Sequence, residues 1–484
     1  MLALLNNNKL FREHCYINGE WVEADNKKTF PVINPADGEI IGHVPQCGVN
    51  ETKQAITAAH NAFVIWRAFT AKQRASLLKK WVELIAKNKE DLAIIMTLEE
   101  GKPLAEARAE IDYANAFIEW FAEEGRRIYG DVIPSNNEKQ HLIVLKQPVG
   151  VVAAITPWNF PSAMITRKCA PALAAGCPVV IKPAEETPYS ALALAVLAEE
   201  AGIPKGVFNV ITGIPEKIGM ELTTNPLVRK FSFTGSTAVG KLLMAQCAST
   251  VKKVSLELGG NAPFIIFEDA DLDAAVKGLM ASKFRNSGQT CVCANRILVQ
   301  DSVYELFSQK LLAAIKTLRV GNGLETNIQQ GPLINKQGLN KVISHVKDAV
   351  DKGAKLLCGG KPKEKHQLFF EPTLLTEVNT KMRIAQEETF GPVAALFRFH
   401  TEEEAIQIAN DTPFGLASYF YSQNLSRIWR VSEKLEYGMV GVNEGMMSNE
   451  IAPFGGVKES GIGREGSKYG IEEFVEIKYL CVSS

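Results

Sequence analysis

The order of hydrophobic and polar positions divides the first quarter of the chain into two parts with different periods. In the first 50 residues, short β-prone runs alternate with turns, and Asn18-Gly19 and Asp37-Gly38 supply the positive φ angles that hairpin turns require. From Glu51 to about Tyr129, apolar residues recur at helical spacing instead. We therefore predict strands and then helices, and we interpret the aromatic stripes of these helices as core packing.

Between Pro148 and Gln300, continuous apolar runs repeatedly precede helical stretches. Strands without polar alternation are buried on both faces, so the pattern predicts a parallel sheet covered by helices. Ligands of such sheets bind beyond the carboxyl ends of the strands, so chemistry is expected in the loops that follow them. The candidate strands are 149–155, 178–182, 207–211, 229–233, 252–257 and 263–267, and the candidate helices are 162–175, 188–201, 216–223, 237–247 and 271–286.

A second alternation of strands and helices runs from Arg296 to about Arg430 and predicts another α/β unit. The segments 139–147 and 472–482 are β-prone, and neither has an obvious pairing partner in its own neighbourhood. No internal repeat, low-complexity tract or linker is visible in the sequence. We therefore expect domains that interleave along the chain.

Composition excludes several classes of protein. The chain has 484 residues, of which 46% are hydrophobic, and its 53 Lys and Arg balance 54 Asp and Glu. This length corresponds to roughly three domains and needs no disulfide or metal to fold, and the balanced charge provides no basic field for nucleic acid. The apolar runs are shorter than the ~18 residues of a membrane span, and no signal-peptide pattern opens the chain. With an odd number of scattered cysteines, we expect a cytoplasmic protein that binds neither membrane nor nucleic acid.

Two of the loops after predicted strands could bind a nucleotide, and a third does not have the usual motif for it. The loop 156–161 lacks the G-x-G-x-x-G pattern of the common dinucleotide fold. The glycine-rich turn 234–240 could place a phosphate at a helix N-terminus, and an ordinary capped helix explains it equally well. Lys182 and Glu185 could hold a ribose, where Glu185 would repel a 2′-phosphate, or they could form only a solvated surface pair.

Two further loops carry residues suited to catalysis. Glu257 follows a buried strand, where burial would raise its pKa toward that of a general base, unless local backbone N–H groups satisfy the carboxylate. Cys291 follows a glycine-containing loop that could expose and stabilise a thiolate, although most single cysteines are inert core residues. We expect no metal site, because Cys291 and Cys293 have no second cysteine pair at zinc spacing. No G-x-S-x-G motif marks a serine nucleophile either.

The motifs are more specific together than apart. Their order along the chain is Pro157-Trp-Asn-Phe-Pro161, Glu257-Leu-Gly-Gly, Gly288-Gln-Thr-Cys291, Glu388-Thr-Phe390-Gly-Pro and Phe454-Gly-Gly-Val-Lys-Glu-Ser-Gly. This combination resembles the aldehyde dehydrogenase superfamily over nearly the whole chain. The resemblance implies an α/β fold with a Rossmann-like parallel-sheet cofactor domain, an α/β catalytic domain and a β oligomerisation arm. The implied boundaries are 1–127 and 148–258 for the NAD(P)-binding domain, 259–460 for the catalytic domain, and 128–147 and 461–484 for the bridging and oligomerisation segments.

The resemblance also implies roles for residues at matching positions. Cys291 would attack the aldehyde carbon to give a thiohemiacetal, and Asn159 and the backbone N–H of Cys291 would form the oxyanion hole. Hydride transfer would leave a thioester, and Glu257 would activate the water that hydrolyses it. The cofactor would be NAD, which Glu185 favours in this family, with NADP possible. The implied cofactor-binding residues are Thr156, Trp158, Lys182, Glu185, Gly213, Gly235, Ser236, Glu388 and Phe390.

Within the family, the sequence resembles the branch that oxidises succinate semialdehyde to succinate. Arg167, Arg285 and Ser448 match the residues with which that branch holds the distal carboxylate, a task that suits planar guanidinium groups. Glutarate semialdehyde as substrate, a thiol esterase on the same Cys291, and a non-catalytic protein of this fold are the alternatives.

The resemblance carries two further implications. The C-x-C pair Cys291 and Cys293 resembles a redox switch that would silence the nucleophile, and a merely packed Cys293 is the alternative. The segments 139–147 and 472–482 resemble an oligomerisation arm, so we expect a homodimer or a homotetramer.

Overall fold

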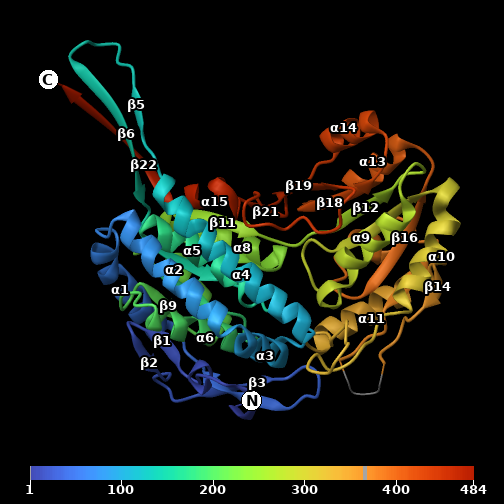
Figure 1. The fold of residues 1–484 in the computed structure, drawn as a ribbon, viewed down its shortest axis with the longest axis horizontal. Coiled ribbons are helices and arrows are strands. Elements are labelled where there is room, and N and C mark those ends of the chain that lie inside the picture. The colour runs from blue at the N-terminus through green and yellow to red at the C-terminus, as the bar shows by residue number, and fades with distance from the viewer. Residues whose placement is uncertain (1, 364–367, 484) are drawn as a thin grey trace.

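The computed structural model describes residues 2–363 and 368–483 and contains two large sheets, each flanked by helices, and a projecting three-stranded arm (Figure 1). The first sheet has the strand order β2-β1-β9-β8-β7-β10-β11-β21. Its five central strands are parallel: β7 (Val151–Ile155), β8 (Val179–Lys182), β9 (Phe208–Val210), β10 (Val228–Thr234) and β11 (Lys253–Glu257). Antiparallel strands β1 (Cys15–Ile17), β2 (Glu20–Val22) and β21 (Gly461–Ile462) form its edges. The five strands predicted between residues 149 and 257 are thus confirmed.

Helices alternate with these strands because each parallel connection must return the chain to the same end of the sheet. They are α5 (Ala163–Ala175), α6 (Pro188–Glu200), α7 (Pro215–Thr224) and α8 (Thr237–Cys247), preceded by α1 (Val49–Trp66), α2 (Ala71–Lys87), α3 (Lys89–Glu100) and α4 (Leu104–Glu124) and followed by α15 (Ser467–Glu472). Thr70 and Gln73 form a capping box that starts α2, and Gly101, with φ of 94°, ends α3. Trp66 and Trp81 are fully buried and donate their indole N–H groups to backbone oxygens, which confirms that the aromatic stripes are core. None of the helices in the described residues is long and apolar enough for a membrane crossing.

The second sheet has the strand order β14-β15-β16-β13-β12-β18-β19, parallel except for β14 at one edge. The strands are β12 (Ala262–Ile266), β13 (Ala294–Gln300), β14 (Lys355–Cys358), β15 (Thr373–Thr376), β16 (Val393–Phe399), β18 (Ala417–Tyr421) and β19 (Met439–Val442). Its helices are α9 (Leu272–Phe284), α10 (Tyr304–Ile315), α11 (Lys336–Asp351), α12 (Arg383–Gln386), α13 (Glu402–Asn410) and α14 (Leu425–Lys434). The predicted strand 263–267 is β12 and belongs to this sheet. Its sequence could not show this, because a strand buried on both faces has the same pattern in either sheet.

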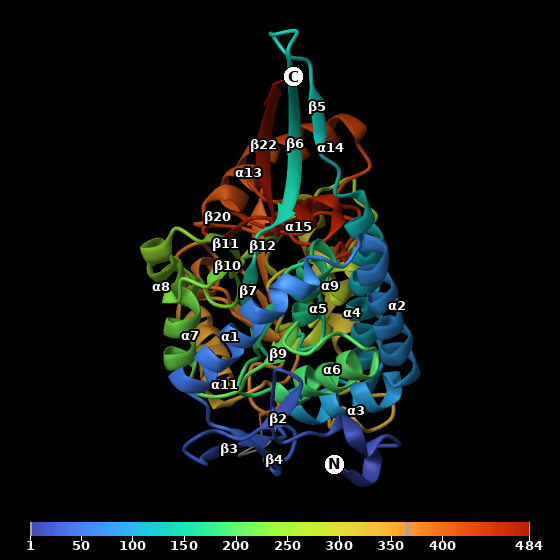
Figure 2. The same cartoon turned by 90° about the vertical axis from the view of Figure 1, so that its left-hand side faces the viewer.

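The arm consists of β5 (Asp131–Ile133), β6 (Gln140–Pro148) and β22 (Val475–Ser483). Strands β6 and β22 pair antiparallel from Pro148 with Val475 to Gln140 with Ser483. The two extended segments without local partners are therefore each other's partners, and they project from the end of the molecule opposite the N-terminus (Figure 2). The domain boundaries at residues 127, 147, 258 and 460 stay predictions.

Two small sheets complete the fold. They are the hairpin of β3 (Thr29–Ile33) and β4 (Ile40–Pro45) and the pair of β17 (Phe414–Gly415) and β20 (Val457–Lys458). Asn18 and Gly19, with φ of 54° and 74°, connect β1 to β2, as their sequence predicted.

Candidate active site

The loops that the sequence singled out meet at one edge of the first sheet. Thr156, Lys182, Gly213, Gly235 and Glu257 lie at or just after the ends of the neighbouring parallel strands β7 to β11. Because the strands are parallel, these ends share one edge of the sheet. The sheet therefore gathers residues that are up to a hundred positions apart in sequence.

A cavity of about 330 Å³ lies at this edge and is closed on its other side by loops of the second sheet. Predicted site residues that line it are Trp158, Asn159, Gly235, Ser236, Cys291, Glu388 and Phe390. Glu185 lines a neighbouring cavity, and the two cavities share Ile334 and Asn335. The predicted nucleophile Cys291, the oxyanion donor Asn159 and the nicotinamide-side residues Glu388 and Phe390 thus line the same cavity.

Cys291 is half-buried in this cavity, and three residues with left-handed backbone precede it in the chain. Asn286, Ser287 and Gly288 have φ of 50°, 57° and 74°. Burial, with the charges of Glu388 and Glu257, raises the pKa of Cys291 to about 12. Burial therefore favours the thiol form of Cys291 over the stabilised thiolate that its loop could provide.

Asn159 is buried next to the loop that carries Cys291. Its side-chain Nδ2 donates to the backbone oxygen of Gln289 at 2.9 Å. An amide nitrogen has two N–H bonds, so this contact fixes the amide and leaves the second N–H for an oxyanion.

Glu257 is buried, and within residues 2–363 and 368–483 neither of its carboxylate oxygens has a hydrogen-bond partner. Burial and the negative charge of Glu465 raise the pKa of Glu257 well above its ordinary value. A side chain at Gly455 would place its Cβ 2.9 Å from Glu257 Oε1, so this glycine makes room for the carboxylate. The alternative in which local backbone N–H groups satisfy Glu257 is therefore wrong.

Glu465 accepts charged hydrogen bonds from two neighbours on α5. Arg167 Nε lies 2.7 Å from Oε2, and Lys168 Nζ contacts Oε1 and Thr234 Oγ1, the latter at 2.6 Å. Together the two cations hold the pKa of Glu465 below its usual value against the effect of burial. Sequence analysis missed Glu465 and Lys168, because nothing in their local pattern shows that they meet across almost 300 residues.

The three predicted substrate-binding residues meet around Tyr113 of α4. Arg167 Nη1 donates to Tyr113 Oη at 3.4 Å. Burial raises the pKa of Tyr113, while the charges of Arg167 and Arg285 and a hydrogen bond with Ser448 oppose the rise. Nε of the half-buried Arg285 and Nη2 of Arg167 have no hydrogen-bond partner in the part of the chain that the structure describes. Tyr113 was missed because in sequence it is one more aromatic residue in a helical stripe.

The predicted nucleotide-binding residues have geometry that fits a dinucleotide. Ser236 caps α8, accepting from Val239 N at 3.4 Å, and the buried Lys182 lies 2.5 Å from Glu185 Oε1. The hydroxyl of Thr156 is buried without a partner among the described residues, so it is available to a ligand. The solvated surface pair is thus ruled out for Lys182, whose ammonium is buried.

The nicotinamide side of the cavity is equally well formed. The rings of Trp158 and Phe390 meet edge to face at 5.6 Å. Glu388 Oε1 accepts from Gly260 N at 3.2 Å, and burial raises the pKa of Glu388 to about 7.

Comparisons with known proteins agree with this geometry. The family model described as the aldehyde dehydrogenase family matches residues 21–480. The chain belongs to the aldehyde dehydrogenase family. It is 62% identical to a glutarate-semialdehyde dehydrogenase of Pseudomonas aeruginosa over 98% of both chains, and 60% identical to an NADP(+) succinate-semialdehyde dehydrogenase of Escherichia coli over 99% of both. A solved succinate-semialdehyde dehydrogenase from Burkholderia pseudomallei matches with a TM-score of 0.99 at 60% identity, covering 99% of this chain and 100% of that one. The resemblance and the fold class drawn from the sequence are confirmed.

In this aldehyde dehydrogenase, Cys293 is buried behind the nucleophile. Its Sγ lies 3.3 Å from Lys283 Nζ, and its backbone N–H donates to Thr290 O at 3.1 Å. The chain therefore turns between residues 290 and 293, as a bond between Cys291 and Cys293 would require, and that bond stays a prediction.

Proposed function

We propose that this aldehyde dehydrogenase oxidises succinate semialdehyde to succinate, with NAD(P) as the hydride acceptor. The observation that carries the proposal is the pair of unpartnered guanidinium nitrogens on Arg167 and Arg285, two residues whose charges both act on Cys291 although neither lines the cavity that contains it. Two planar cations suit a carboxylate at the far end of an aldehyde. Relatives named for succinate and glutarate semialdehydes support this substrate class, and glutarate semialdehyde is the second candidate.

The first chemical step is attack of the Cys291 sulfur on the aldehyde carbon. Because the pKa of Cys291 is about 12, the proton must leave as the carbon–sulfur bond forms. Glu257, with a raised pKa and no hydrogen-bond partner for its carboxylate in the described residues, is suited to accept that proton. The amide of Asn159 and the backbone N–H of Cys291 stabilise the oxyanion of the thiohemiacetal.

The second step releases the acid. When bound, the cofactor would supply a nicotinamide ring as acceptor of the hydride from the thiohemiacetal carbon, and the acyl group would stay on Cys291 as a thioester. Glu257 must first release the Cys291 proton to solvent. It then takes a proton from a water molecule whose oxygen attacks the thioester carbon, and it passes this proton to the Cys291 sulfur as the carbon–sulfur bond breaks. The burial that raises the pKa of Glu257 thus serves both proton transfers.

The cofactor would be held by residues at the edge of the first sheet and by the loop before β16 of the second sheet. Lys182 and Glu185 would hold the adenosine ribose, Ser236 with Gly235 the pyrophosphate, and Glu388 and Phe390 the nicotinamide ribose. Thr156, Trp158 and Gly213 would complete the cofactor site. Glu185 favours NAD, because its charge would repel a 2′-phosphate. The Escherichia coli relative is named for NADP(+), so NADP is included in the proposal.

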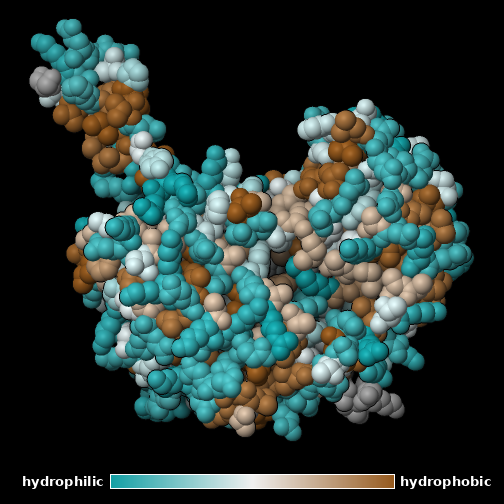
Figure 3. Space-filling view, viewed as in Figure 1, coloured by the Kyte–Doolittle hydropathy of each residue, from teal (hydrophilic) through white to brown (hydrophobic). Residues whose placement is uncertain are grey.

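A homo-oligomer is the expected assembly, either a dimer or a tetramer. Brown, hydrophobic residues cover much of the projecting arm in Figure 3, where solvent contact is unfavourable unless a partner covers them. The exposed apolar residues of the arm are Val132, Ile133, Leu145, Ile477, Tyr479 and Val482. We also propose a cytoplasmic location, because scattered cysteines in odd number suit a reducing compartment.

The experiment is a spectrophotometric assay of NADH and NADPH formation with succinate semialdehyde, glutarate semialdehyde and hexanal, run beside hydrolysis of a model ester. Arg285→Ala is expected to raise KM for succinate semialdehyde by about 10- to 100-fold, the effect of losing a charged hydrogen bond. KM for hexanal should change less than about twofold, since hexanal has no carboxylate to bind. Arg167→Ala should act in the same direction but also removes a partner of Glu465, so Arg285 is the cleaner test.

Equal losses on both aldehydes would contradict the carboxylate clamp. Ester hydrolysis without aldehyde-dependent reduction of either cofactor would favour the thiol esterase instead. Absence of both activities would favour a non-catalytic protein.

A further inference from the structure

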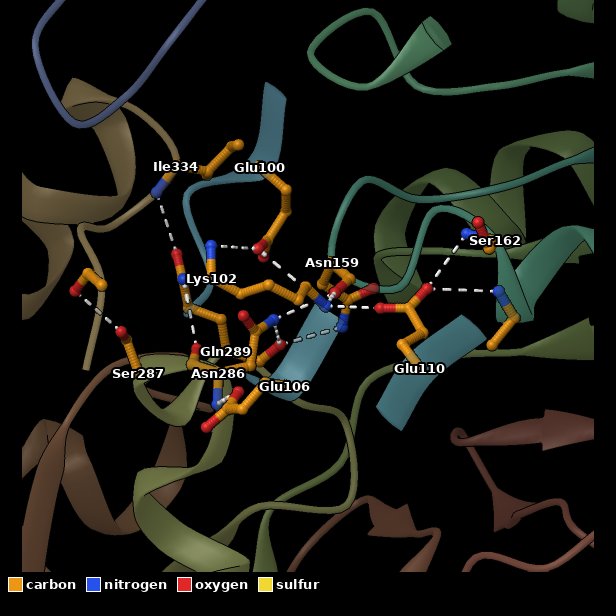
Figure 4. Close-up of polar contacts among 12 residues, drawn as sticks. Glu100, Lys102, Glu106, Glu110, Asn159, Ser162, Asn286, Ser287, Gln289 and Ile334 are labelled. Carbon is orange, nitrogen blue, oxygen red and sulfur yellow. Dashed lines mark hydrogen bonds and ion pairs between the residues drawn. The ribbon is translucent and has the colours of Figure 1, made fainter. Parts of the chain in front are cut away.

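A buried charged cluster lies behind Asn159, and no step of the proposed reaction uses it (Figure 4). Its centre is Lys102, between α3 and α4, which is 2% exposed. Lys102 Nζ donates to Glu110 Oε2 at 2.5 Å and to the backbone oxygen of Asn159 at 2.7 Å. The ammonium also lies 4.2 Å from the centre of the Phe160 ring. A single buried cation therefore contacts both the residue that carries the oxyanion amide and the residue after it.

Glu110 anchors the other end of the same loop. Its Oε1 accepts from the backbone N–H groups of Ser162 at 3.0 Å and Ala163 at 3.2 Å, at the start of α5. A carboxylate at this place satisfies N–H groups that the helix itself leaves unpaired. The Lys102–Glu110 pair thus holds the segment 159–163 at both ends, Lys102 at Asn159 and Glu110 at Ser162 and Ala163.

Asn286 ties this loop to the loop that leads to the nucleophile. Its Nδ2 donates to Asn159 O at 3.0 Å and to Gln289 O at 3.5 Å. Asn159 Nδ2 in turn donates to Gln289 O at 2.9 Å. Asn286 therefore holds the backbone oxygen of Asn159, and Gln289 O holds its side-chain amide. Gln289 lies two residues before Cys291 in the chain.

Burying an ion pair costs desolvation free energy that a well-packed apolar pair would not cost, so stability alone does not explain Lys102 and Glu110. Lys102 and Glu110 instead form hydrogen bonds with the backbone of one short segment, residues 159–163. Oxyanion donors act only within a few tenths of an ångström of the right position, and a misplacement of 1 Å can cost about 100-fold in rate.

We propose that Lys102 and Asn286 are positioning residues that fix the Asn159 amide relative to Cys291. The inference rests on the proposed function, in which Asn159 stabilises the oxyanion. Lys102 fixes the position of residues 159–163 through its hydrogen bond to Asn159 O. Asn286 connects these residues to the loop that leads to Cys291. Neither residue lines the cavity that contains Cys291.

The test is a set of double-mutant cycles with Asn159→Ala. Lys102→Met removes the ammonium and keeps the length of the side chain, and Asn286→Gly removes the amide while tolerating φ of 50°. Ser287→Gly is the matched control, because Ser287 also has a left-handed backbone, with φ of 57°, but its hydroxyl donates to Gly331 O at 2.9 Å. The readouts are the single-turnover rate of cofactor reduction, KM for succinate semialdehyde and the temperature of thermal unfolding.

Asn159→Ala alone should lower the single-turnover rate by about 100-fold or more, as for loss of an oxyanion donor. Lys102→Met and Asn286→Gly should each lower it by about tenfold with KM within about twofold, and Ser287→Gly should stay within about twofold. In the Asn159→Ala background, Lys102→Met and Asn286→Gly should cost less than about twofold more, since the amide that they position is already gone.

Full additivity in the Asn159→Ala background overturns the inference, and so does a Ser287→Gly rate as low as that of Asn286→Gly. If Lys102→Met does not fold because Glu110 is left unpaired, the Asn286→Gly cycle decides alone. An Asn159→Ala rate equal to that of the wild type overturns the oxyanion role in the proposed function, and the positioning role with it.

Discussion

At the scale of single residues, Glu257 takes its acid–base character from residues that are distant in sequence. Burial removes the carboxylate from water, and Glu465 places a second negative charge near it. Arg167 and Lys168 act in the opposite direction, and Glu465 neutralises both of them through direct contacts. The pKa of Glu257 therefore depends on whether Glu465 is charged.

We predict that Glu465→Gln shifts the pH profile of thioester hydrolysis to lower pH. Glu257 acts as a base only when deprotonated, so hydrolysis rises with pH through its pKa. Removing the charge of Glu465 lowers that pKa directly, and it also leaves Arg167 and Lys168 free to stabilise the carboxylate. The measurement is the pH dependence of kcat with an ester substrate, under conditions in which hydrolysis of the acyl-enzyme limits the rate.

Glu473→Gln is the control for this experiment. Glu473 also pairs with a buried lysine, Lys230, at 2.8 Å, but it is not among the main charges that act on Glu257. Its profile should match the wild type. A Glu465→Gln profile that stays in place or moves to higher pH would contradict the prediction.

We also predict that Cys293 makes oxidation of the nucleophile reversible. Hydrogen peroxide oxidises Cys291 to a sulfenic acid, and the Cys293 thiol then displaces water to form a disulfide that dithiothreitol reduces. Cys293→Ala should lose activity as the wild type does but recover poorly, because its sulfenic acid has no neighbouring thiol to react with and oxidises further.

Recovered dehydrogenase activity after dithiothreitol treatment is the measurement. Cys358→Ala, which changes another half-buried thiol, should recover like the wild type. Equal recovery of all three proteins would leave Cys293 as a packing residue.

At the scale of secondary-structure elements, strand ends control where polar residues emerge. Lys182 is the last residue of β8, and the loop after it brings Glu185 to 2.5 Å from its ammonium. If the adenosine ribose binds here as proposed, the Glu185 carboxylate would face the 2′-phosphate of NADP.

We predict that Glu185→Ser raises kcat/KM for NADP relative to NAD by about tenfold, which is about 1.4 kcal/mol. The substitution removes a like charge from the 2′-phosphate and frees Lys182 to meet it. Kinetics with both cofactors at fixed aldehyde measure the ratio. Glu186→Ser is the matched control, because Glu186 accepts from Asn335 instead, at 3.1 Å. An unchanged ratio for Glu185→Ser, or an equal change in both variants, would count against the role of Glu185.

At the scale of the whole molecule, the arm is the part that the fold leaves uncovered. Its central pair, β6 and β22, joins segments more than 300 residues apart, and Ile477 on it is 70% exposed. Burying such side chains against a second copy is favourable by about 25 cal/mol per Å² of apolar surface.

We predict that Ile477→Lys dissociates the oligomer into smaller species. A charge in the middle of an apolar contact must be desolvated without a partner, which opposes association. Sedimentation velocity of the wild type and the variant measures the change. Ile65→Lys, on α1, changes an isoleucine that is 59% exposed outside the arm and should sediment like the wild type. Identical sedimentation of all three proteins would show that the arm does not hold the assembly together.

The sequence by itself determined the α/β class and the central strands of the first sheet, and it supplied the motifs from which the roles of Glu257, Asn159 and Cys291 are proposed. Each of these follows from order along the chain, either as an apolar period or as a short motif. The arm was visible only as two strands without partners, because pairing between residues 140–148 and 475–483 leaves no local trace.

Only the tertiary structure decided what surrounds the chemical residues. Contacts between distant segments placed Glu465 beside Arg167, and Tyr113 beside the three predicted substrate residues. Burial, which no local pattern measures, reversed the expectation for Cys291 by raising its pKa to about 12. The sequence thus indicated which groups are proposed to react, while their protonation and orientation depend on side chains that only folding brings together.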